Sequence, residues 1–266
     1  MIIGQDKLLN SINNSLNDFP KTNLLVGESG SGRKTIIKYI SEKLQAETVD
    51  ITDKISLDMI TDIYLETDRF VYIIDINKIS VKDQNTILKF IEEPPASAII
   101  FLLCEKIHSV LPTVSNRCYE WVLEPYTKET LRKIVFNLGL SVDEETYNIF
   151  DTPGKIISAN NLRNLSAYKE LSIKIIQSIK RANYINSLKL TSYFVAQKDE
   201  TEPKFDLDIF VPILSHYTTE EIINGNSDLD YFYNVILDFS RKIKNKSYNK
   251  KMLLDRFFYD LRGSVQ

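Results

Sequence analysis

A glycine-rich segment near the start of the sequence has the residue types of a phosphate-binding loop and reads VGESGSGRKT over residues 26–35. Between a strand and a helix, such a loop turns backbone N–H groups toward phosphate at the helix N-terminus. A loop that binds a nucleoside triphosphate together with magnesium needs Lys directly after its last Gly. The next residue must be Ser or Thr, whose hydroxyl binds the metal. Here Arg33 follows Gly32, and Lys34 stands in the place of the hydroxyl residue. Because each residue turns a helix by about 100°, we expect Lys34 to point away from the phosphates.

We therefore predict a degenerate phosphate loop that binds an anion weakly and does not turn over ATP. Its candidate binding residues are Gly27, Gly30, Gly32, Arg33 and Lys34.

The second candidate is an apolar strand that ends in an acid, with the sequence FVYIID at residues 70–75. In nucleotide hydrolases an Asp at this place serves magnesium, and an adjacent Glu activates the water. Ile76 occupies the position of that Glu, so the site lacks its base. Asp75 is a degenerate magnesium-site residue in this interpretation, and it fits a helix cap or a turn equally well.

The elements that would position these residues alternate between strand and helix. Five continuously apolar runs are typical of strands covered on both faces: residues 23–26, 48–51, 71–76, 98–103 and 119–123. Three amphipathic helical patterns lie between them. The first has the apolar residues Ile36, Ile37, Ile40 and Leu44, and the second has Leu57, Ile60, Ile63 and Tyr64 after an expected N-cap at Ser56. The third covers residues 85–91 and ends at Glu92-Glu93-Pro94-Pro95. The alternation predicts a parallel α/β sheet.

After Glu124 the patterns are almost entirely helical. Thr127 opens a helix that Gly139 stops, residues 141–150 form a second short helix, and residues 152–154 read as a turn. Longer helical patterns follow at residues 165–195, 207–216, 229–243 and 251–261, with a loop at residues 200–203.

Composition excludes several classes of protein. The 266 residues are 43% apolar and 26% charged, which is too apolar for a disordered chain, and a net charge of −3 argues against a basic nucleic-acid coat. Cys104 and Cys118 form no C-x-x-C pair, so neither a disulfide scaffold nor a structural zinc site is expected. Without a signal-peptide pattern, and with no apolar run near the roughly 20 residues that span a bilayer, we expect a cytoplasmic protein.

The order of these motifs resembles the clamp-loader subunits of the AAA+ class, and within them the delta-prime family of bacterial DNA polymerase III. The residues that carry the resemblance are Ile3-Gly4-Gln5, the glycine-rich loop, NTILK at residues 85–89, EEPP at residues 92–95, the strand at residues 101–103, Asn116-Arg117-Cys118 in place of Ser-Arg-Cys, and residues 151–155, which are similar to a turn in the family's small lid domain. They cover roughly residues 2–160.

The resemblance implies an α/β P-loop (AAA+) domain at residues 1–123, an all-α lid at residues 124–165 and an all-α collar at residues 166–266. It implies a non-hydrolysing stator subunit that helps to load the sliding clamp onto primed DNA. The implied partners are gamma/tau-type ATPase subunits and the delta subunit, and through them the clamp and primer–template DNA.

The resemblance also places Arg117 at the subunit edge, as an arginine finger that faces the ATP of a neighbouring subunit. The alternative is a structural Arg paired with a carboxylate such as Glu120 or Glu93.

Two departures from the family weaken any cofactor or ATPase prediction. Many bacterial relatives carry a four-cysteine zinc module between the loop helix and the acidic strand, and residues 34–70 contain no Cys. Cys104-Glu105 replaces the polar sensor pair expected after the strand at residues 98–103. We therefore expect no resident cofactor beyond weak binding of phosphate or nucleotide, and no metal.

Two other functions stay open. One is an autonomous AAA+ ATPase that tolerates Arg33-Lys34 in its loop. The other is a DNA-binding module that uses the basic stretch at residues 241–262 and its aromatic residues, among them Tyr248, Phe257, Phe258 and Tyr259. Against the second, Leu253, Leu254, Phe257, Phe258 and Leu261 have the spacing of packing residues on a collar helix.

Overall fold

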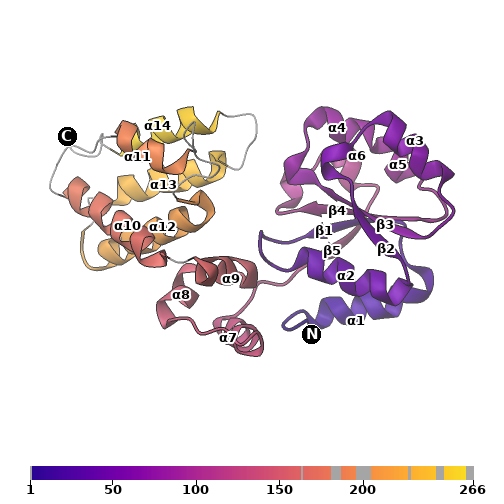
Figure 1. Ribbon diagram of the computed structural model, residues 1–266, viewed down its shortest axis with the longest axis horizontal. Helices are drawn as coiled ribbons and strands as arrows, with labels where there is room; N and C mark the ends of the chain where they lie inside the picture. The colour runs from indigo at the N-terminus through magenta and orange to yellow at the C-terminus, as the bar shows by residue number, and fades with distance from the viewer. Residues whose placement is uncertain are drawn as a thin grey trace. The chain divides into compact units, whose positions relative to one another are not determined.

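Five strands form one parallel sheet in the computed structural model, which describes residues 2–162, 164–180, 187–195, 205–226, 229–243 and 249–261 (Figure 1). The strands are β1 Thr22–Val26, β2 Glu47–Asp50, β3 Phe70–Asp75, β4 Ala98–Cys104 and β5 Tyr119–Val122. They lie in the order β2-β3-β4-β1-β5, and every pairing is parallel. The predicted parallel α/β sheet is confirmed, with each strand end within one residue of the apolar run that predicted it.

Burial along the sheet differs between its centre and its edges. Every residue of the central strand β4 is buried, as a strand covered on both faces requires. The outer strands β2 and β5 are largely exposed, and Tyr119 and Val122 each have 52% of their surface exposed to solvent. The prediction that all five runs are covered on both faces is therefore wrong for these two, because each has a sheet neighbour on one side only.

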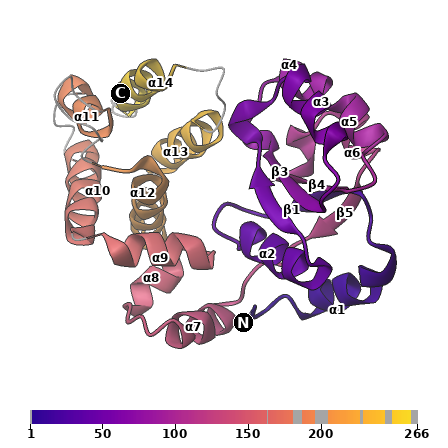
Figure 2. The same cartoon turned by 45° about the vertical axis from the view of Figure 1, so that its right-hand side comes forward.

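Helices cover both faces of the sheet (Figures 1 and 2). On one face, α1 Asp6–Ser15 and α2 Arg33–Leu44 bury Ile12, Ile37 and Ile40 against side chains such as Phe101. On the other face, α3 Leu57–Leu65, α4 Val81–Thr86, α5 Leu88–Glu92 and α6 Pro112–Ser115 pack against alternate strand residues such as Leu102. Four short 3₁₀ helices lie at Leu16–Asp18, Thr52–Lys54, Ile76–Lys78 and Ile107–Ser109.

Two helix predictions need correction. The Ser56 hydroxyl caps α3 by accepting a hydrogen bond from the Met59 N–H, as expected, but Leu57 and Tyr64 are exposed on the outer side of that helix. Instead of the single helix predicted at residues 85–91 there are two: α4 starts earlier, behind a capping box at Ser80, and α5 follows after a break at Ile87. The helical pattern still ends at Glu92, just before the two prolines.

The chain divides into two compact units. Unit 1 contains Met1–Gly139 and Asp151–Gly154, and unit 2 contains Leu140–Phe150 and Lys155–Gln266. Unit 1 thus includes α7 Lys128–Asn137, which Thr127 caps and which ends before Gly139 at φ 67°, as predicted. The boundaries predicted at residues 123 and 165 stay a prediction.

Every regular element that the structure describes in unit 2 is a helix. Its helices are α8 Glu144–Ile149, the main part of α9 Pro153–Asn161, α10 Leu165–Lys180, α11 Ser187–Phe194, α12 Leu207–Ile223, α13 Asp230–Lys242 and α14 Lys250–Asp260. Phe194 lies at the centre of an aromatic core, with its ring 4.6 Å from Phe210 and 5.8 Å from both Phe205 and Phe258. No helix among the described residues is long and apolar enough to cross a membrane.

Two helical predictions in this half differ from the structure. Residues 152–154 do not form a free turn; Pro153 is the first residue of α9, where its missing N–H leaves no helical bond unmade. The pattern at residues 207–216 continues through α12 to Ile223. Within the pattern at residues 165–195 the structure describes α10 and α11, and residues 181–186 lie outside the described residues. The loop predicted at residues 200–203 lies outside the described residues.

The C-terminal half of the basic stretch forms the helix α14, which buries its apolar residues and exposes its basic ones. Leu254, Phe257, Phe258 and Leu261 are buried, while Lys250, Lys251 and Arg256 are exposed. Phe257 and Phe258 are therefore unable to stack on DNA bases. Lys244, Lys246, Tyr248 and Arg262 lie outside the described residues.

A network of polar side chains joins three helices of unit 2. Lys169 of α10 binds the carboxylates of Asp143, at 3.1 Å, and Glu145, and the Tyr217 hydroxyl of α12 donates to Glu145 over 2.6 Å. Hydrogen bonds from Thr146 and Lys169 hold the pKa of Asp143 below its usual value. Burial acts to raise the pKa of Glu145, but the bonds from Lys169 and Tyr217 outweigh it and lower that pKa as well.

We expect acid to destabilise unit 2 through this network. A carboxylate with a lowered pKa in the folded state stabilises the fold above its unfolded pKa, near 4, and loses this contribution as the pH falls through the folded value. The urea midpoint of unit 2, followed by circular dichroism, should fall as the pH drops below about 5. The fall should be shallower in Glu145→Gln, and an equal slope in both proteins would contradict the assignment.

Candidate functional site

The glycine-rich loop connects β1 to α2 with a backbone that requires glycine. Gly30 has φ 78° and Gly32 has φ 91°, in the left-handed region that side chains disfavour. Gly32 is the N-cap of α2 and has no side chain to satisfy the first helical N–H groups. At Gly27 an added Cβ would lie 2.8 Å from the Ser31 Oγ and 3.1 Å from Leu123, so the chain is tightly packed there.

Two polar atoms at this helix N-terminus are buried without a hydrogen-bond partner. They are the Ser31 Oγ, on a residue with 4% of its surface exposed, and Nη1 of Arg33. The Arg33 charge also reaches the carboxyl end of β4, where burial raises the pKa of the Cys104 thiol to about 12 while Arg33 acts to lower it. An anion would satisfy both unpaired atoms together with the positive end of the helix.

Lys34 is directed away from the loop. Its Nζ lies 2.8 Å from Oδ2 of Asp50, at the end of the edge strand β2. Burial acts to raise the pKa of Asp50, but the bonds from Lys34 and Thr52 outweigh it and hold that pKa below its usual value. Of the two basic residues in the loop motif, only Arg33 therefore turns toward the carboxyl end of the central strands.

Asp75 has the geometry of a turn cap at the end of β3. Its carboxylate accepts hydrogen bonds from the backbone N–H of Asn77 at 3.1 Å and from the Asn77 amide at 2.9 Å. Its own N–H donates to the Thr52 hydroxyl at 2.9 Å. Ile76, in the position of the missing base, is buried with 2% of its surface exposed.

Arg117 follows α6 and is held by two neighbours. Its Nε pairs with the Glu92 carboxylate at the end of α5, and its Nη1 donates to the Thr113 carbonyl over 2.5 Å. Its carboxylate partner is Glu92, whereas the sequence suggests Glu120 or Glu93. The side chain remains 38% exposed, so part of the guanidinium faces solvent.

A cavity of about 240 Å³ lies beside the loop, within unit 1. Its lining includes Ser31 and four acidic residues: Glu28, Glu105, Glu124 and Asp151. The contribution of residues 151–152 to this wall was not expected from the sequence, because they lie more than 100 positions beyond the loop.

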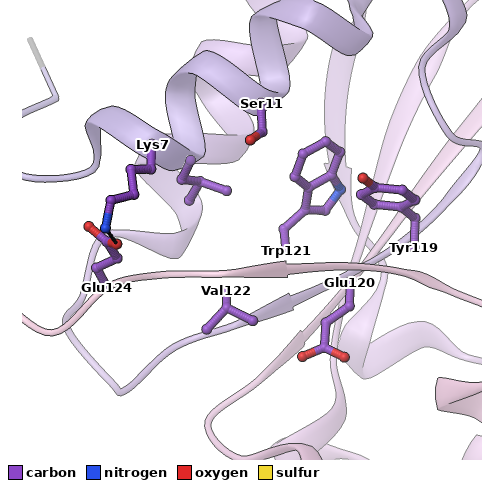
Figure 3. A pocket seen from close by; sticks show the side chains of 8 residues that line it. Lys7, Ser11, Tyr119, Glu120, Trp121, Val122 and Glu124 are labelled. Carbon is purple, nitrogen blue, oxygen red and sulfur yellow. Dashed lines mark hydrogen bonds and ion pairs between the residues drawn. The ribbon is translucent and has the colours of Figure 1, made fainter.

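A second hollow, of about 220 Å³, lies between α1 and the edge strand β5 (Figure 3). Tyr119 and Trp121 point toward α1, whereas Glu120 and Val122 point to the other side of the strand (Figure 3). Lys7 closes one end through an ion pair with Glu124 at 2.8 Å. The residues that line this hollow do not include a nucleophile with an adjacent base, so it is a surface feature without catalytic geometry.

Comparison with solved structures supports the fold class. A variant of RuvB from Thermotoga maritima matches with a TM-score of 0.51 and 15% identity, covering 82% of this chain and 88% of that one. A DNA polymerase III gamma subunit-related protein from Thermotoga maritima matches with a TM-score of 0.49 and 16% identity, covering 97% of this chain and all of the other. At 15% identity the RuvB match concerns the fold alone, a parallel sheet with helices on both faces.

Comparison with family models adds the clamp-loader connection. Residues 37–127 match the family described as DNA polymerase III, delta subunit. This segment runs from α2 through β5 and includes Asp75, Glu92 and Arg117. The match covers about one third of the chain. No curated protein sequence matches the chain.

Proposed function

We propose that this chain is a non-hydrolysing stator subunit, of the delta-prime type, in a DNA polymerase III clamp loader. The observation that carries the clamp-loader part of the proposal is the family match over residues 37–127, and the delta-prime type rests on the motif resemblance over residues 2–160. The state of the loop supports the non-hydrolysing role, since Lys34 binds Asp50 and Ile76 replaces the base. The chain would act as a fixed member of an assembly that opens the sliding clamp and places it on primer–template DNA.

Arg117 is the residue through which a stator would act on chemistry. A guanidinium stays charged and donates in a planar fork to phosphate oxygens. The contacts with Glu92 and Thr113 hold this side chain at the surface of unit 1. We assign it the role of an arginine finger for the ATP of a neighbouring ATPase subunit.

Reconstitution tests the assembly. The full chain is mixed with purified gamma/tau-type ATPase subunits and the delta subunit of a bacterial clamp loader from the same source, and the mixture is analysed by size-exclusion chromatography. We expect a complex that contains all the subunits and that loads the sliding clamp only when this chain is present. Separate elution of this chain at micromolar concentrations, with loading unchanged by its omission, would refute the stator proposal.

The alternative of an autonomous ATPase predicts turnover by the purified chain alone. We expect none above background in a coupled ATPase assay, because the loop and the base position are both altered. The double variant Arg33→Lys, Lys34→Thr restores the loop motif, and it should gain ATP affinity without turnover because Ile76 remains. Sustained turnover of about 1 per second or more by the wild-type chain would establish the enzyme instead.

The DNA-binding alternative predicts binding of DNA by the isolated chain that weakens steeply with salt. The burial of Phe257 and Phe258 removes two of its stacking residues. A gel-shift series in rising salt, with Lys250→Gln and Lys251→Gln as variants, distinguishes it from the stator proposal.

A further inference from the structure

Three consecutive carbonyl groups of the glycine-rich loop are each held by a donor from beyond residue 125. The Ser29 carbonyl accepts a hydrogen bond from the Thr152 hydroxyl at 3.0 Å. The Gly30 carbonyl accepts one from the Gly154 N–H at 2.8 Å. The Ser31 carbonyl accepts one from the Tyr126 hydroxyl at 2.8 Å. All of these residues belong to unit 1.

These bonds fix the orientation of three peptide planes. In a planar trans peptide the N–H points opposite to the preceding C=O. Holding the carbonyls of Ser29, Gly30 and Ser31 therefore directs the following N–H groups to the other side of the loop. The N–H of Ser31 already donates to the Glu28 carbonyl at 3.1 Å. The N–H groups of Gly30 and Gly32 are thus directed away from the donors at residues 126, 152 and 154.

Gly154 is required by contact rather than by backbone conformation. A Cβ at this position would lie 2.6 Å from the Gly30 Cα and 2.9 Å from the Gly30 carbonyl oxygen. Both atoms belong to the backbone of Gly30, so the rotation of a side chain could not relieve the clash. Gly154 is not among the glycines with positive φ, and it lies in the first turn of α9, where Ala is otherwise the better residue.

The same loop carries the two unpaired buried atoms, the Ser31 Oγ and Nη1 of Arg33. An oxyanion at the uncapped N-terminus of α2 would offer acceptors to donors on this loop. A loop of glycines would lose conformational entropy when it closed on such an ion, unless its shape were already fixed.

We propose that Thr152, Gly154 and Tyr126 are positioning residues that hold the glycine-rich loop in its anion-binding shape before any ligand arrives. The inference rests on the anion site predicted for this loop and is independent of the stator role. It gives the chain a preformed binding site for a small oxyanion.

Hydrogen exchange of the full chain, measured by mass spectrometry over residues 27–34, tests the positioning role directly. Thr152→Val and Tyr126→Phe each remove one hydroxyl, and exchange of the loop amides should speed up by about three- to tenfold, the effect of one lost hydrogen bond. Gly154→Ala should speed it up at least as much. Thr152→Ser keeps the hydroxyl and should behave as wild type.

Matched controls lie away from the loop. Thr61→Val removes a hydroxyl that bonds the Leu57 carbonyl within α3, and Tyr39→Phe removes one that bonds Asn13. Neither should change exchange in the loop. Unchanged loop exchange in Thr152→Val, Tyr126→Phe and Gly154→Ala alike would overturn the proposal.

Titration with inorganic phosphate, followed by isothermal calorimetry or amide chemical shifts, gives the second readout. Thr152→Val and Tyr126→Phe should weaken phosphate binding by about three- to tenfold, and Thr152→Ser should restore it. Tighter binding in the variants would also overturn the proposal, because the contacts would then hold the loop closed. If the wild type binds no phosphate, the prediction that this loop is an anion site is wrong. The exchange data then still decide whether these residues fix the shape of the loop.

Discussion

Replacing Arg117 with alanine should slow ATP turnover at the neighbouring ATPase site of the reconstituted clamp loader by about 10³-fold or more. Arginine fingers supplied in trans contribute on the order of 10³–10⁵ to the rate of phosphoryl transfer. The fold should survive, because the Arg117 side chain is 38% exposed and its ion pair with Glu92 is near the surface. The measurement is DNA-stimulated, single-turnover hydrolysis in the complex, with assembly checked by size-exclusion chromatography.

Two further variants separate the finger from a structural role. Arg117→Lys keeps the charge but loses the planar fork, so it should recover little of the rate. Glu92→Gln removes the carboxylate that pairs with Arg117 but does not alter the guanidinium itself. It should keep at least the wild-type rate, because the carboxylate competes with phosphate for the same donors. Wild-type hydrolysis and clamp loading by Arg117→Ala would remove the case for the finger.

Local sequence patterns predicted the strands and several helix ends well. Runs of apolar residues located all five strands, and the side chains of Ser56 and Thr127 cap the helices that they were expected to open. Such signals depend on neighbours in sequence. Exposure of β2 and β5 depends instead on strand order, which a single run of residues does not contain.

In the candidate site, too, some residues follow from local sequence and others depend on contacts between distant segments. The glycines and the displaced Lys34 followed from residue types and helical rotation, and Lys34 does turn away toward Asp50. The pairing of Arg117 with Glu92 arises where α5 meets α6, so sequence separation gave no reason to prefer Glu92 over its neighbour Glu93. In the sequence, Gly154 is only part of a turn motif. Its contact with Gly30 joins positions 124 residues apart.

Replacing Phe101 with alanine should destabilise unit 1 by about 3–5 kcal/mol, the usual cost of emptying a buried phenylalanine site. Phe101 lies in the middle of β4 with none of its surface exposed, and its ring centre is 6.1 Å from that of Phe19. The only tryptophan of the chain, Trp121, is buried in the same core and reports on this unit. Its fluorescence midpoint in urea should fall by about 1.5–2.5 M.

Phe210→Ala is the matched control, because Phe210 is equally buried but lies in α12 of unit 2. It should shift the helical signal in circular dichroism and leave the Trp121 transition nearly in place, since each unit has its own core and separate domains unfold in separate transitions. An equal shift of the Trp121 midpoint by both variants would show that the two units unfold as one. The glycine-rich loop and Arg117 would then share their stability with the helical unit, and a variant in either core would disturb both functions together.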